Sequence, residues 1–416
     1  MSTNRLVVDL HLHSRYSMAT SPQLNITTIA RTAAWKGIDL VAAPDFTHPA
    51  WREEMRAGLE PSGDGVFRVR NGAANTPQFI LVTEIACIWR WPHAGKAGSR
   101  SRRVHVLLMA PSFDAVDRIS AQLAKYQRLE SDGRPMIKRS AEDIYSLALD
   151  ADERCVLFPA HAWTPWYGVY GSKSGFDRLA DCFGEHAERV PAIETGLSSD
   201  PYMNWGVSDI GDRAIVSFSD AHSAVTIGRE LTILDATPSY ESVRSALFEN
   251  RVLETIEFHP EHGKYHLSGH RKCGVRLAPT ETPADGRCPV CHKPLTLGVM
   301  HRVAELTHRH VEEPLLRDGL FCTTVEGQKP FRKLVPLREL AATALNAGLN
   351  TKKVTQACER IVEACGSELS ALVSAQERQV AEVGGDHLAS AVMAVRSGNV
   401  TVEPGFDGVY GSVSPL

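Results

Sequence analysis

The chain has 416 residues, with 43% hydrophobic and 23% charged side chains and a formal net charge of -4 at pH 7. This length is enough for two or three domains with a large core, and the composition is ordinary for a soluble globular protein. The charge excludes a global signal for nucleic-acid binding, and no apolar stretch approaches the roughly 20 residues of a membrane-spanning helix.

The first residues and the cysteines indicate in which cellular compartment the protein is expected. The first residues run directly into a strand pattern, so we expect no secretory signal peptide. Most of the nine cysteines stand singly in apolar runs, which is typical of reduced, buried thiols in a cytoplasmic protein.

Seven short apolar runs in the first part of the chain each end in, or contain, a residue type that binds metals. They are LVVDL (6–10) before His11 and His13, DLVAAP (39–44) before Asp45 and His48, FILVT (79–83) before Glu84, RVHVLLM (103–109) around His105, CVLFPA (155–160) before His161, AIE (192–194) ending in Glu194, and AIVSFS (214–219) before Asp220 and His222. Helix-like stretches lie between the runs at 26–37, 114–129 and 140–149, and a further one follows at 239–250. This alternation predicts parallel strands with crossover helices, and polar residues at the carboxyl ends of such strands mark the active face of a (β/α) barrel.

The number of these residues favours a metal centre over structural histidines. A lone histidine after a strand is usually structural, but here seven runs out of seven carry His, Asp or Glu. Burying so many ionisable groups around one axis costs free energy unless cations pair with them. Mixed imidazole and carboxylate ligands suit zinc, manganese or iron. The surplus of ligands predicts two or three ions, which suit the hydrolysis of phosphoryl esters because one ion activates water and another stabilises the leaving oxygen.

These motifs resemble those of the polymerase and histidinol phosphatase (PHP) family. His11 and His13 match its first motif, His-x-His, and Asp220 and His222 match its last, Asp-x-His. The second motif departs from the family's Thr-Asp-His, because Phe46 follows Asp45 and the histidine is displaced to position 48. The resemblance implies an α/β fold with a distorted seven-stranded (β/α)7 PHP barrel over residues 1–258, holding two or three divalent metals (Zn, Mn, Fe or Mg). The implied ligands are His11, His13, Asp45, His48, Glu84, His105, His161, Asp220 and His222, and the implied catalytic residues are Asp220, Glu84 and His222.

Longer phrases resemble the endonuclease Q family, whose members are DNA-repair enzymes within the PHP family. They are DFTHP (45–49), PAHAWTPW (159–166), ETGLSSDP (194–201), SDAHS (219–223), GHRKCGVRL (269–277), CPVCHKPLTLGV (288–299) and PGFDGVYG (404–411). This resemblance covers nearly the whole chain. It implies a hydrolase that cuts the phosphodiester 5′ to a deaminated base (uracil, hypoxanthine or xanthine) or an abasic site and leaves a 3′-hydroxyl. The implied partner is damaged DNA in the cytoplasm, at the nucleoid, with a sliding clamp as a further candidate and no membrane.

An aromatic loop, HAWTPWYGVYGSKSGF (161–176), follows the fifth run and should overhang the metals. Its rings suit base stacking or a wedge into the duplex, and the loop GLSSDP (196–201) is the second expected wall of a pocket for a flipped base. The alternative, in which one or two rings cap the barrel, stays open. The residues expected to contact DNA here are Trp163, Trp166, Tyr170, Lys173, Ser198 and Ser199.

A small zinc-binding module is predicted over residues 259–335. His270-x-x-Cys273 and Cys288-x-x-Cys291 form two pairs with the spacing of a structural zinc site. The fourth ligand stays open, because His266, His292 and His301 also lie near in sequence. Residues 262–310 hold eight Lys or Arg against three acidic residues. This local charge predicts a phosphate-binding face that includes Arg271 and Lys272.

The remaining residues, 336–416, predict a helical region without a catalytic constellation. Helical periodicity occurs at 337–349, 352–366 and 386–399, with Thr351 placed to cap the second helix, and a short strand should follow the third. Two alternatives to a DNA-lesion endonuclease are a PHP-type phosphomonoesterase of the histidinol-phosphatase kind and a non-catalytic, metal-containing DNA-binding protein. The module, the aromatic loop and the extra helices favour the endonuclease, since a small phosphate ester needs none of them.

Overall fold

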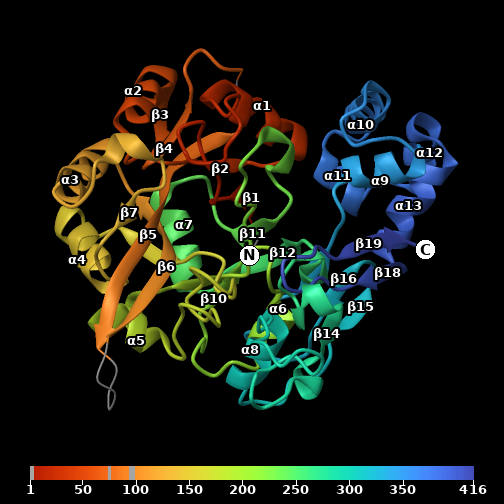
Figure 1. The fold of residues 1–416 in the computed structure, drawn as a ribbon. Helices are drawn as coiled ribbons and strands as arrows, with labels where there is room; N and C mark the ends of the chain where they lie inside the picture. The colour runs from red at the N-terminus through yellow and green to blue at the C-terminus, as the bar shows by residue number, and fades with distance from the viewer. Residues whose placement is uncertain (1–3, 74–75, 93–98) are drawn as a thin grey trace.

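The computed structural model describes residues 4–73, 76–92 and 99–416, and it shows a large central sheet covered by helices, with a further group of helices near the carboxyl end (Figure 1). The central sheet has 13 strands. They are β1 (Arg5–Asp9), β2 (Leu40–Ala43), β3 (Leu59–Gly63), β4 (Val66–Val69), β5 (Gln78–Pro92), β6 (Ser99–Ala110), β7 (Met136–Ile137), β8 (Val156–Pro159), β11 (Leu231–Asp235), β12 (Val252–Glu257), β15 (Leu315–Arg317), β16 (Leu320–Cys322) and β17 (Phe331–Lys333).

The strands that precede the predicted ligands form a closed circuit. β12, β11, β1, β2, β5, β6 and β8 are hydrogen-bonded in that order. β8 contacts β9 (Ala192–Glu194), β9 pairs in parallel with β10 (Ala214–Val216), and β10 contacts β12. The circuit brings the ends of strands that are far apart in sequence to one place.

The circuit contains both parallel and antiparallel strand pairs, so the expectation of uniformly parallel strands is wrong for several pairs. β1, β2 and β5 are parallel, whereas β5–β6–β8 and β1–β11–β12 are antiparallel. A parallel crossover needs a dozen or more residues, and residues 93–98 alone connect β5 to β6. Two long strands joined in this way must run as a hairpin, the orange ribbon of Figure 1.

Helices in the first part of the chain are α1 (Ile26–Lys36), α2 (Pro49–Gly58), α3 (Phe113–Leu123), α4 (Ala141–Ala151), α5 (Leu179–Phe183), α6 (Pro201–Trp205) and α7 (Tyr240–Phe248). Short 3-10 helices lie at Leu129–Ser131 (η1), Gly184–Arg189 (η2), Ala224–Thr226 (η3), Pro260–His262 (η4), Arg271–Cys273 (η5) and Pro279–Glu281 (η6).

Local capping residues decide where several helices begin and end. α1 ends at Gly37, whose φ of 87° is a left-handed conformation that glycine adopts without strain. α4 begins with the predicted capping box of Ser140 and Asp143. The helix predicted to begin at Asp114 is capped instead by Ser112, and Asp114 lies in its first turn, where its charge suits the helix dipole.

The predicted module contains a small hairpin and one helix and is continuous with the central sheet. Its elements are β13 (Ser268–His270), β14 (Val275–Leu277) and α8 (Val299–Leu306). β17 pairs in parallel with β12, so the central sheet continues through β17, β16 and β15 beyond residue 258.

The carboxyl-terminal region is helical, as predicted. It contains α9 (Leu337–Ala344), α10 (Lys352–Cys365), α11 (Glu368–Val373), α12 (Glu377–Gly384), α13 (Asp386–Arg396), β18 (Val400–Glu403) and β19 (Ser412–Pro415). Thr351 caps α10 as expected, whereas α11 and α12 were not predicted. A buried ion pair of 2.9 Å between Lys36 Nζ and Glu368 Oε1 joins this region to α1. None of the described helices combines the length and the apolar character needed to cross a bilayer.

Candidate metal centre and adjoining pocket

Two histidines after β1 direct their Nε2 atoms at the same two carboxylates. His11 Nε2 lies 3.4 Å from Asp220 Oδ1 and 3.8 Å from Glu84 Oε2. His13 Nε2 lies 3.2 Å from Asp220 Oδ1 and 3.3 Å from Glu84 Oε2. These four residues form a group whose ligand atoms all lie within 4.8 Å of one another.

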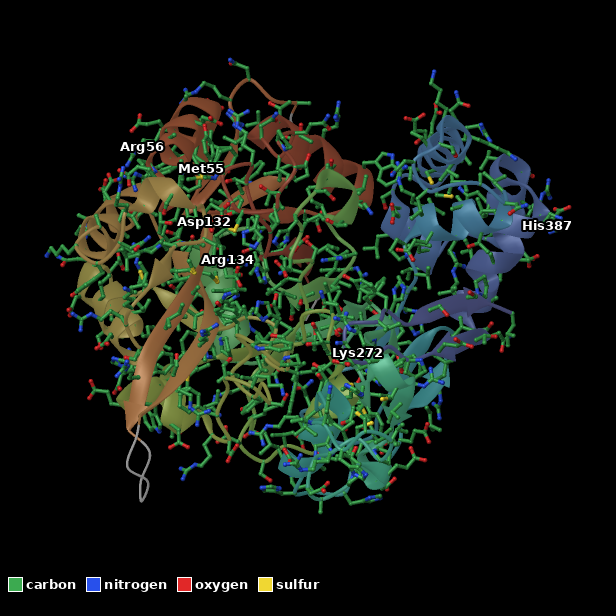
Figure 2. The ribbon with its side chains drawn as sticks, in the orientation of Figure 1. Met55, Arg56, Asp132, Arg134, Lys272 and His387 are labelled. Atoms are coloured by element: carbon green, nitrogen blue, oxygen red, sulfur yellow. The ribbon has the colours of Figure 1, made fainter. Side chains whose placement is uncertain are left out.

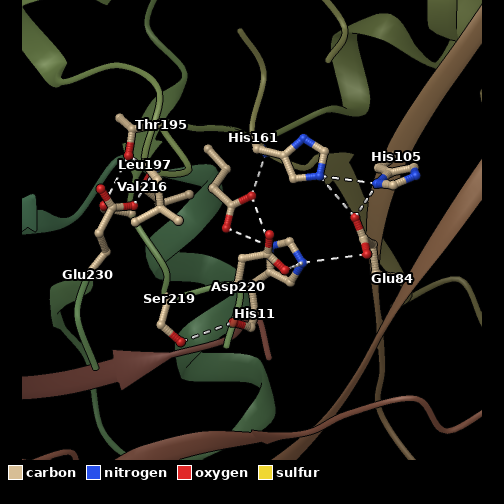
Figure 3. A network of polar contacts seen from close by, with 12 residues as sticks. His11, Glu84, His105, His161, Thr195, Leu197, Val216, Ser219, Asp220 and Glu230 are labelled. Atoms are coloured by element: carbon tan, nitrogen blue, oxygen red, sulfur yellow. Dashed lines mark hydrogen bonds and ion pairs between the residues drawn. The ribbon is translucent and has the colours of Figure 1, made fainter. Parts of the chain in front are cut away.

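Glu84 is shared with a second group, which comes from the β5–β6 hairpin and the end of β8 (Figure 3). Its Oε1 atom lies 2.6 Å from His105 Nδ1 and 3.1 Å from His161 Nε2. The two imidazole nitrogens are 3.1 Å apart. One carboxylate therefore offers an oxygen to each of two clusters.

Two further carboxylates hold the outer nitrogens of the first pair of histidines. His11 Nδ1 lies 2.9 Å from Glu194 Oε1, and His13 Nδ1 lies 3.2 Å from Asp45 Oδ1. Contacts of this kind fix the tautomer and the ring orientation of a metal-binding histidine and raise its basicity. Each Nε2 atom is thereby left as the ligand atom that faces the cluster.

Three residues of the centre have backbones in the left-handed region, where side chains other than glycine are strained. The φ angles are 51° at Asp45, 30° at His161 and 44° at Asp220. Such conformations persist only where the surrounding structure imposes them, and they gather at functional sites. At His161 and Asp220 it accompanies a side chain that belongs to a cluster, and at Asp45 one that contacts His13 Nδ1.

The buried carboxylates of the centre interact favourably with positive charge. Burial alone would lower the pKa of His11, but Glu194 and Asp220 overcome this effect and raise it well above its usual value. Burial would likewise raise the pKa of Glu84, but His105 and Arg134 hold it well below its usual range. Burial lowers the pKa of His105 to about 4, so this ring is neutral and can act as a ligand.

The residues present fit divalent metal ions. His11 Nε2 is fully buried and has no hydrogen-bond partner, although an isolated buried nitrogen is costly. The donors are imidazole nitrogens and carboxylate oxygens, a set that suits zinc, manganese or iron. The two described clusters of the centre therefore support the expectation that it holds more than one ion.

Three predicted ligands lie outside these clusters. Asp45 is a positioning residue, because its Oδ1 faces His13 while its Oδ2 accepts hydrogen bonds from Ser14 N and Ser17 Oγ. His48 is the N-cap of α2 and uses both ring nitrogens, on Trp51 N and Glu130 O; its role as a metal ligand stays a prediction.

The third is His222, which adjoins the first cluster. Its ring centroid is 4.5 Å from that of His13, and its Nδ1 atom lies 2.9 Å from the carbonyl oxygen of Asp220. Its role as a ligand or catalytic residue stays a prediction.

A separate cluster forms in the predicted module. His270, Cys273, Cys288 and Cys291 bring their ligand atoms within 4.8 Å of one another, with 3.4 Å between Cys291 Sγ and His270 Nδ1. The other histidines considered from sequence are not part of this group. Four convergent nitrogen and sulfur ligands with no fifth are typical of a closed, structural zinc site.

A pocket of about 270 Å³ adjoins the metal centre. Its lining includes His161 and Asp220 from the centre, and Trp166 and Ser198 from the two loops that were expected to form its walls. The third wall comes from residues 260–266 of the module and from Tyr410. Gly405 N and Gly411 N donate hydrogen bonds to the carbonyl oxygens of Glu261 and His262, which brings the end of the chain to this wall.

Aromatic and basic groups give the pocket its character. The rings of Trp166 and Tyr265 meet edge to face, with centroids 5.2 Å apart. Lys264 Nζ lies 5.6 Å from the ring centroids of both Tyr265 and Tyr410. Tyr410 lies in the phrase PGFDGVYG and Lys264 in the basic segment 262–310, but the sequence analysis placed neither them nor Tyr265 at the site, because no local pattern brings them beside the metal centre.

The aromatic loop contributes one exposed ring rather than three. Trp163 and Tyr170 are completely buried, and they donate hydrogen bonds to Asn204 and Asp209. This burial contradicts their expected contact with DNA and favours the alternative in which rings cap the barrel. Trp166, by contrast, is 41% exposed.

The other residues expected to contact DNA are distributed unevenly. Ser198 lines the pocket, whereas Ser199 is buried and bonded within the fold. Lys173 is half-buried, and Arg271 and Lys272 are exposed. Figure 2 labels Lys272 on the module. Contact of Lys173, Ser198, Arg271 and Lys272 with DNA stays a prediction.

Some known proteins match a part of the chain and others match nearly all of it. A family model described as the MJ0043 C-terminal domain matches residues 336–399. The uncharacterized protein MJ0043 of Methanocaldococcus jannaschii is 28% identical over 283 residues, which cover 65% of this chain and 34% of that protein, so the chain spans about a third of that relative. The uncharacterized protein YqxK of Bacillus subtilis is 25% identical over 440 residues, which cover 99% of this chain and 100% of that protein.

Two solved structures match the whole fold. The crystal structure of the lesion-specific endonuclease PfuEndoQ from Pyrococcus furiosus matches with a TM-score of 0.83 and 28% identity, over 99% of this chain and 95% of that chain. An endonuclease Q complex, with a 27-mer duplex substrate that has an abasic lesion at the active site, matches with a TM-score of 0.83 and 29% identity, over 99% of this chain and 97% of that chain. The chain resembles endonuclease Q. Because the endonuclease Q structures match 99% of the chain, both metal clusters, the Cys–His cluster and the pocket lie within the matched fold.

Proposed function

We propose that the chain is a metal-dependent DNA endonuclease of DNA repair that hydrolyses the phosphodiester 5′ to a deaminated base or an abasic site and leaves a 3′-hydroxyl. One observation carries the proposal: a pocket large enough for a nucleobase opens on Asp220 and His161, beside the metal clusters. The full-length resemblance to endonuclease Q, one structure of which holds a duplex with an abasic lesion, supports the same function.

The proposed fold assignment follows from the same features. The circuit of strands around the clusters is the PHP-type barrel of residues 1–258, and the Cys–His cluster is the zinc site of a module over residues 259–335. Residues 336–416 form the helical carboxyl-terminal region. The proposed partner is DNA with a lesion, and contact with a sliding clamp stays a prediction.

In this proposal the damaged nucleotide leaves the duplex and enters the pocket. Extrusion costs a few kcal/mol, and it costs less for a mispaired or missing base than for a normal pair. Trp166 and Tyr265 offer ring faces to the nucleotide, while the Ser198 hydroxyl and Lys264 offer polar contacts to its edge or backbone. Selection thus begins with the ease of extrusion and continues with the fit to the pocket.

The chain's own residues then orient the scissile phosphate. His11, His13, Glu84, His105, His161 and Asp220 would hold the ions, which supply activation of water and neutralisation of phosphate charge when bound. Glu194 and Asp45 keep His11 and His13 in place. His222 donates its Nδ1–H to the carbonyl oxygen of Asp220, which leaves Nε2 as a ligand atom or an acceptor for a water proton.

Cleavage of defined duplexes tests the proposal. End-labelled duplexes that carry one deoxyuridine, deoxyinosine or abasic site are incubated with the protein and Mn²⁺, Mg²⁺ or Zn²⁺, beside an undamaged duplex and a small phosphomonoester. We expect one nick 5′ to the lesion, none in the undamaged duplex, and none with Asp220→Asn. Asp117→Asn, a surface change of the same kind, should nick normally. Hydrolysis of the phosphomonoester without any nick would instead favour a phosphatase.

A further inference from the structure

Arg134 enters the metal centre from the loop between η1 and β7, a position that the pattern of strand-end ligands does not predict. Hydrogen bonds hold this loop on both sides. Gly133 N donates to the carbonyl oxygen of Tyr16 at 2.9 Å, and Ala86 N donates to the carbonyl oxygen of Pro135 at 3.0 Å. The loop is therefore tied both to the segment that follows His13 and to β5.

Asp132 and Gly133, the two residues before Arg134, hold its loop close to the metal centre. Asp132 Oδ1 accepts hydrogen bonds of 3.1 Å from both Met18 N and Arg134 N. Gly133 approaches so closely that a Cβ atom there would overlap the side chains of Ser17 and Asp45. Figure 2 places Asp132 and Arg134 next to each other beside the β5–β6 hairpin. The approach of this loop to the centre thus depends on a glycine and on a carboxylate that binds both its own loop and the segment after His13.

The guanidinium reaches Glu84, the carboxylate that the two clusters share. Arg134 Nη1 lies 3.1 Å from Glu84 Oε2, the same oxygen that lies 3.3 Å from His13 Nε2. The side chain is 24% exposed, so it borders the open side of the cluster. Arginine has five N–H donors in a planar fork, and a single contact with Glu84 leaves several of them for another anion.

No other lysine or arginine in the described part of the chain forms an ion pair with a carboxylate of the centre. Arg229 is the nearest comparison, but it donates to the carbonyl oxygens of Ser219 and Asp220 and so supports the backbone. Asp220 itself lines the pocket and contributes to the electrostatic environment of Arg134. A phosphate attached to a nucleotide in the pocket would therefore face Arg134 on the other side of the cluster.

We propose that Arg134 is a catalytic residue that donates to a non-bridging oxygen of the scissile phosphate and stabilises the charge that develops there during hydrolysis. This inference rests on the proposed endonuclease function. Guanidinium donors suit phosphate because two N–H groups can bind two oxygens. A preorganised donor at a developing negative charge contributes more to the rate than to ground-state binding.

Single-turnover nicking of an abasic duplex tests the role, with wild type, Arg134→Gln, Arg134→Lys and the control Arg128→Gln, an exposed arginine at the start of η1. We expect Arg134→Gln to lower the rate by about 100-fold, the order found when one such donor is removed. Arg134→Lys should retain part of the rate, and Arg128→Gln should match wild type. DNA affinity in Ca²⁺ and metal content should stay within about twofold in all four proteins, since chemistry alone is affected.

A second readout separates phosphate contact from mere support of Glu84. When one phosphorothioate diastereomer replaces the scissile phosphate, the nicking rate of wild type should fall. The same replacement should lower the nicking rate of Arg134→Gln by a smaller factor. Three outcomes would each overturn the inference and leave the endonuclease function intact. Arg134→Gln could nick at a rate within threefold of wild type, or its thio effect could equal that of wild type. The lower rate of Arg134→Gln could also be accounted for by loss of metal. If wild type nicks no lesion, the proposed function fails, and hydrolysis of bis(4-nitrophenyl) phosphate decides about Arg134. Equal rates in wild type and Arg134→Gln, or no hydrolysis by wild type, then overturn the inference as well.

Discussion

Trp166 and Trp163 are three residues apart in the same loop, yet replacing each by alanine should have different consequences. Trp166 is 41% exposed and lines the pocket. Stacking of a base on an aromatic ring contributes about 1–3 kcal/mol per base. Trp166→Ala should therefore weaken binding of lesion DNA about 5- to 150-fold. The fold should lose only about 1 kcal/mol, the order of one edge-to-face contact such as that with Tyr265.

Trp163→Ala is the matched comparison. This ring is fully buried, and its Nε1–H donates to Asn204 Oδ1 at 2.8 Å. Removing it leaves a cavity and an unpaired amide oxygen, so we expect a loss of about 3–5 kcal/mol of folding free energy. The change should act on DNA affinity only through the population of folded protein.

The assay measures Kd by anisotropy in Ca²⁺, with a deoxyuridine duplex and an undamaged duplex, and the free energy of unfolding in urea. Trp166→Ala should lose the preference for the lesion while its urea midpoint hardly moves. Trp163→Ala should keep the preference while its urea midpoint falls. If Trp166→Ala binds the deoxyuridine duplex as tightly as wild type, this ring does not contact the extruded base, and the reasoning from exposure is wrong.

The remaining predictions concern three buried groups. Asp45→Asn should lower metal affinity or nicking about 10- to 100-fold, because the amide no longer fixes the Nδ1 tautomer of His13; unchanged metal content and rate would refute this role. Cys288→Ser should release one zinc, measured by elemental analysis, while Cys365→Ser, outside the described cluster, should release none; equal zinc in the two variants would contradict the site. Burial raises the pKa of Glu257 from 4.5 to about 8, so the folded state binds the proton more tightly than the unfolded state, and stability should fall as pH rises from 4.5 to about 8. Glu257→Gln should remove about 1.4 kcal/mol per pH unit of that slope in urea titrations, and identical slopes would exclude Glu257 as the cause.

Local patterns were enough to find the residues that form the two clusters of the candidate metal centre. His11, His13, Glu84, His161 and Asp220 follow apolar runs that form strands, and the place where a buried strand ends can be recognised over a few residues. The caps of α1, α4 and α10 depend equally on neighbours three or four residues away. The two spaced pairs of the Cys–His cluster meet, as their short separation predicts.

Contacts between distant segments decided the role of each residue, and no local pattern encodes them. Glu84 becomes the shared carboxylate only because the β5–β6 hairpin places His105 opposite Ala86, two residues along the strand from Glu84, and that hairpin was expected to be a parallel crossover. The motifs alone cannot distinguish a member of the cluster such as His13 from a helix cap such as His48.

Burial is likewise a property of the folded chain rather than of residue type. Trp163 and Tyr170 look like Trp166 in sequence, yet packing against α6 and its neighbours covers the first two and leaves the third at the pocket. Tyr265, Tyr410 and Arg134 reach the site from loops whose positions depend on backbone hydrogen bonds to remote segments. The sequence by itself determined which atoms could bind metals, because that is a property of side-chain chemistry and strand-end position, whereas only the tertiary structure decided which of them meet, since convergence requires the long-range register of the whole sheet.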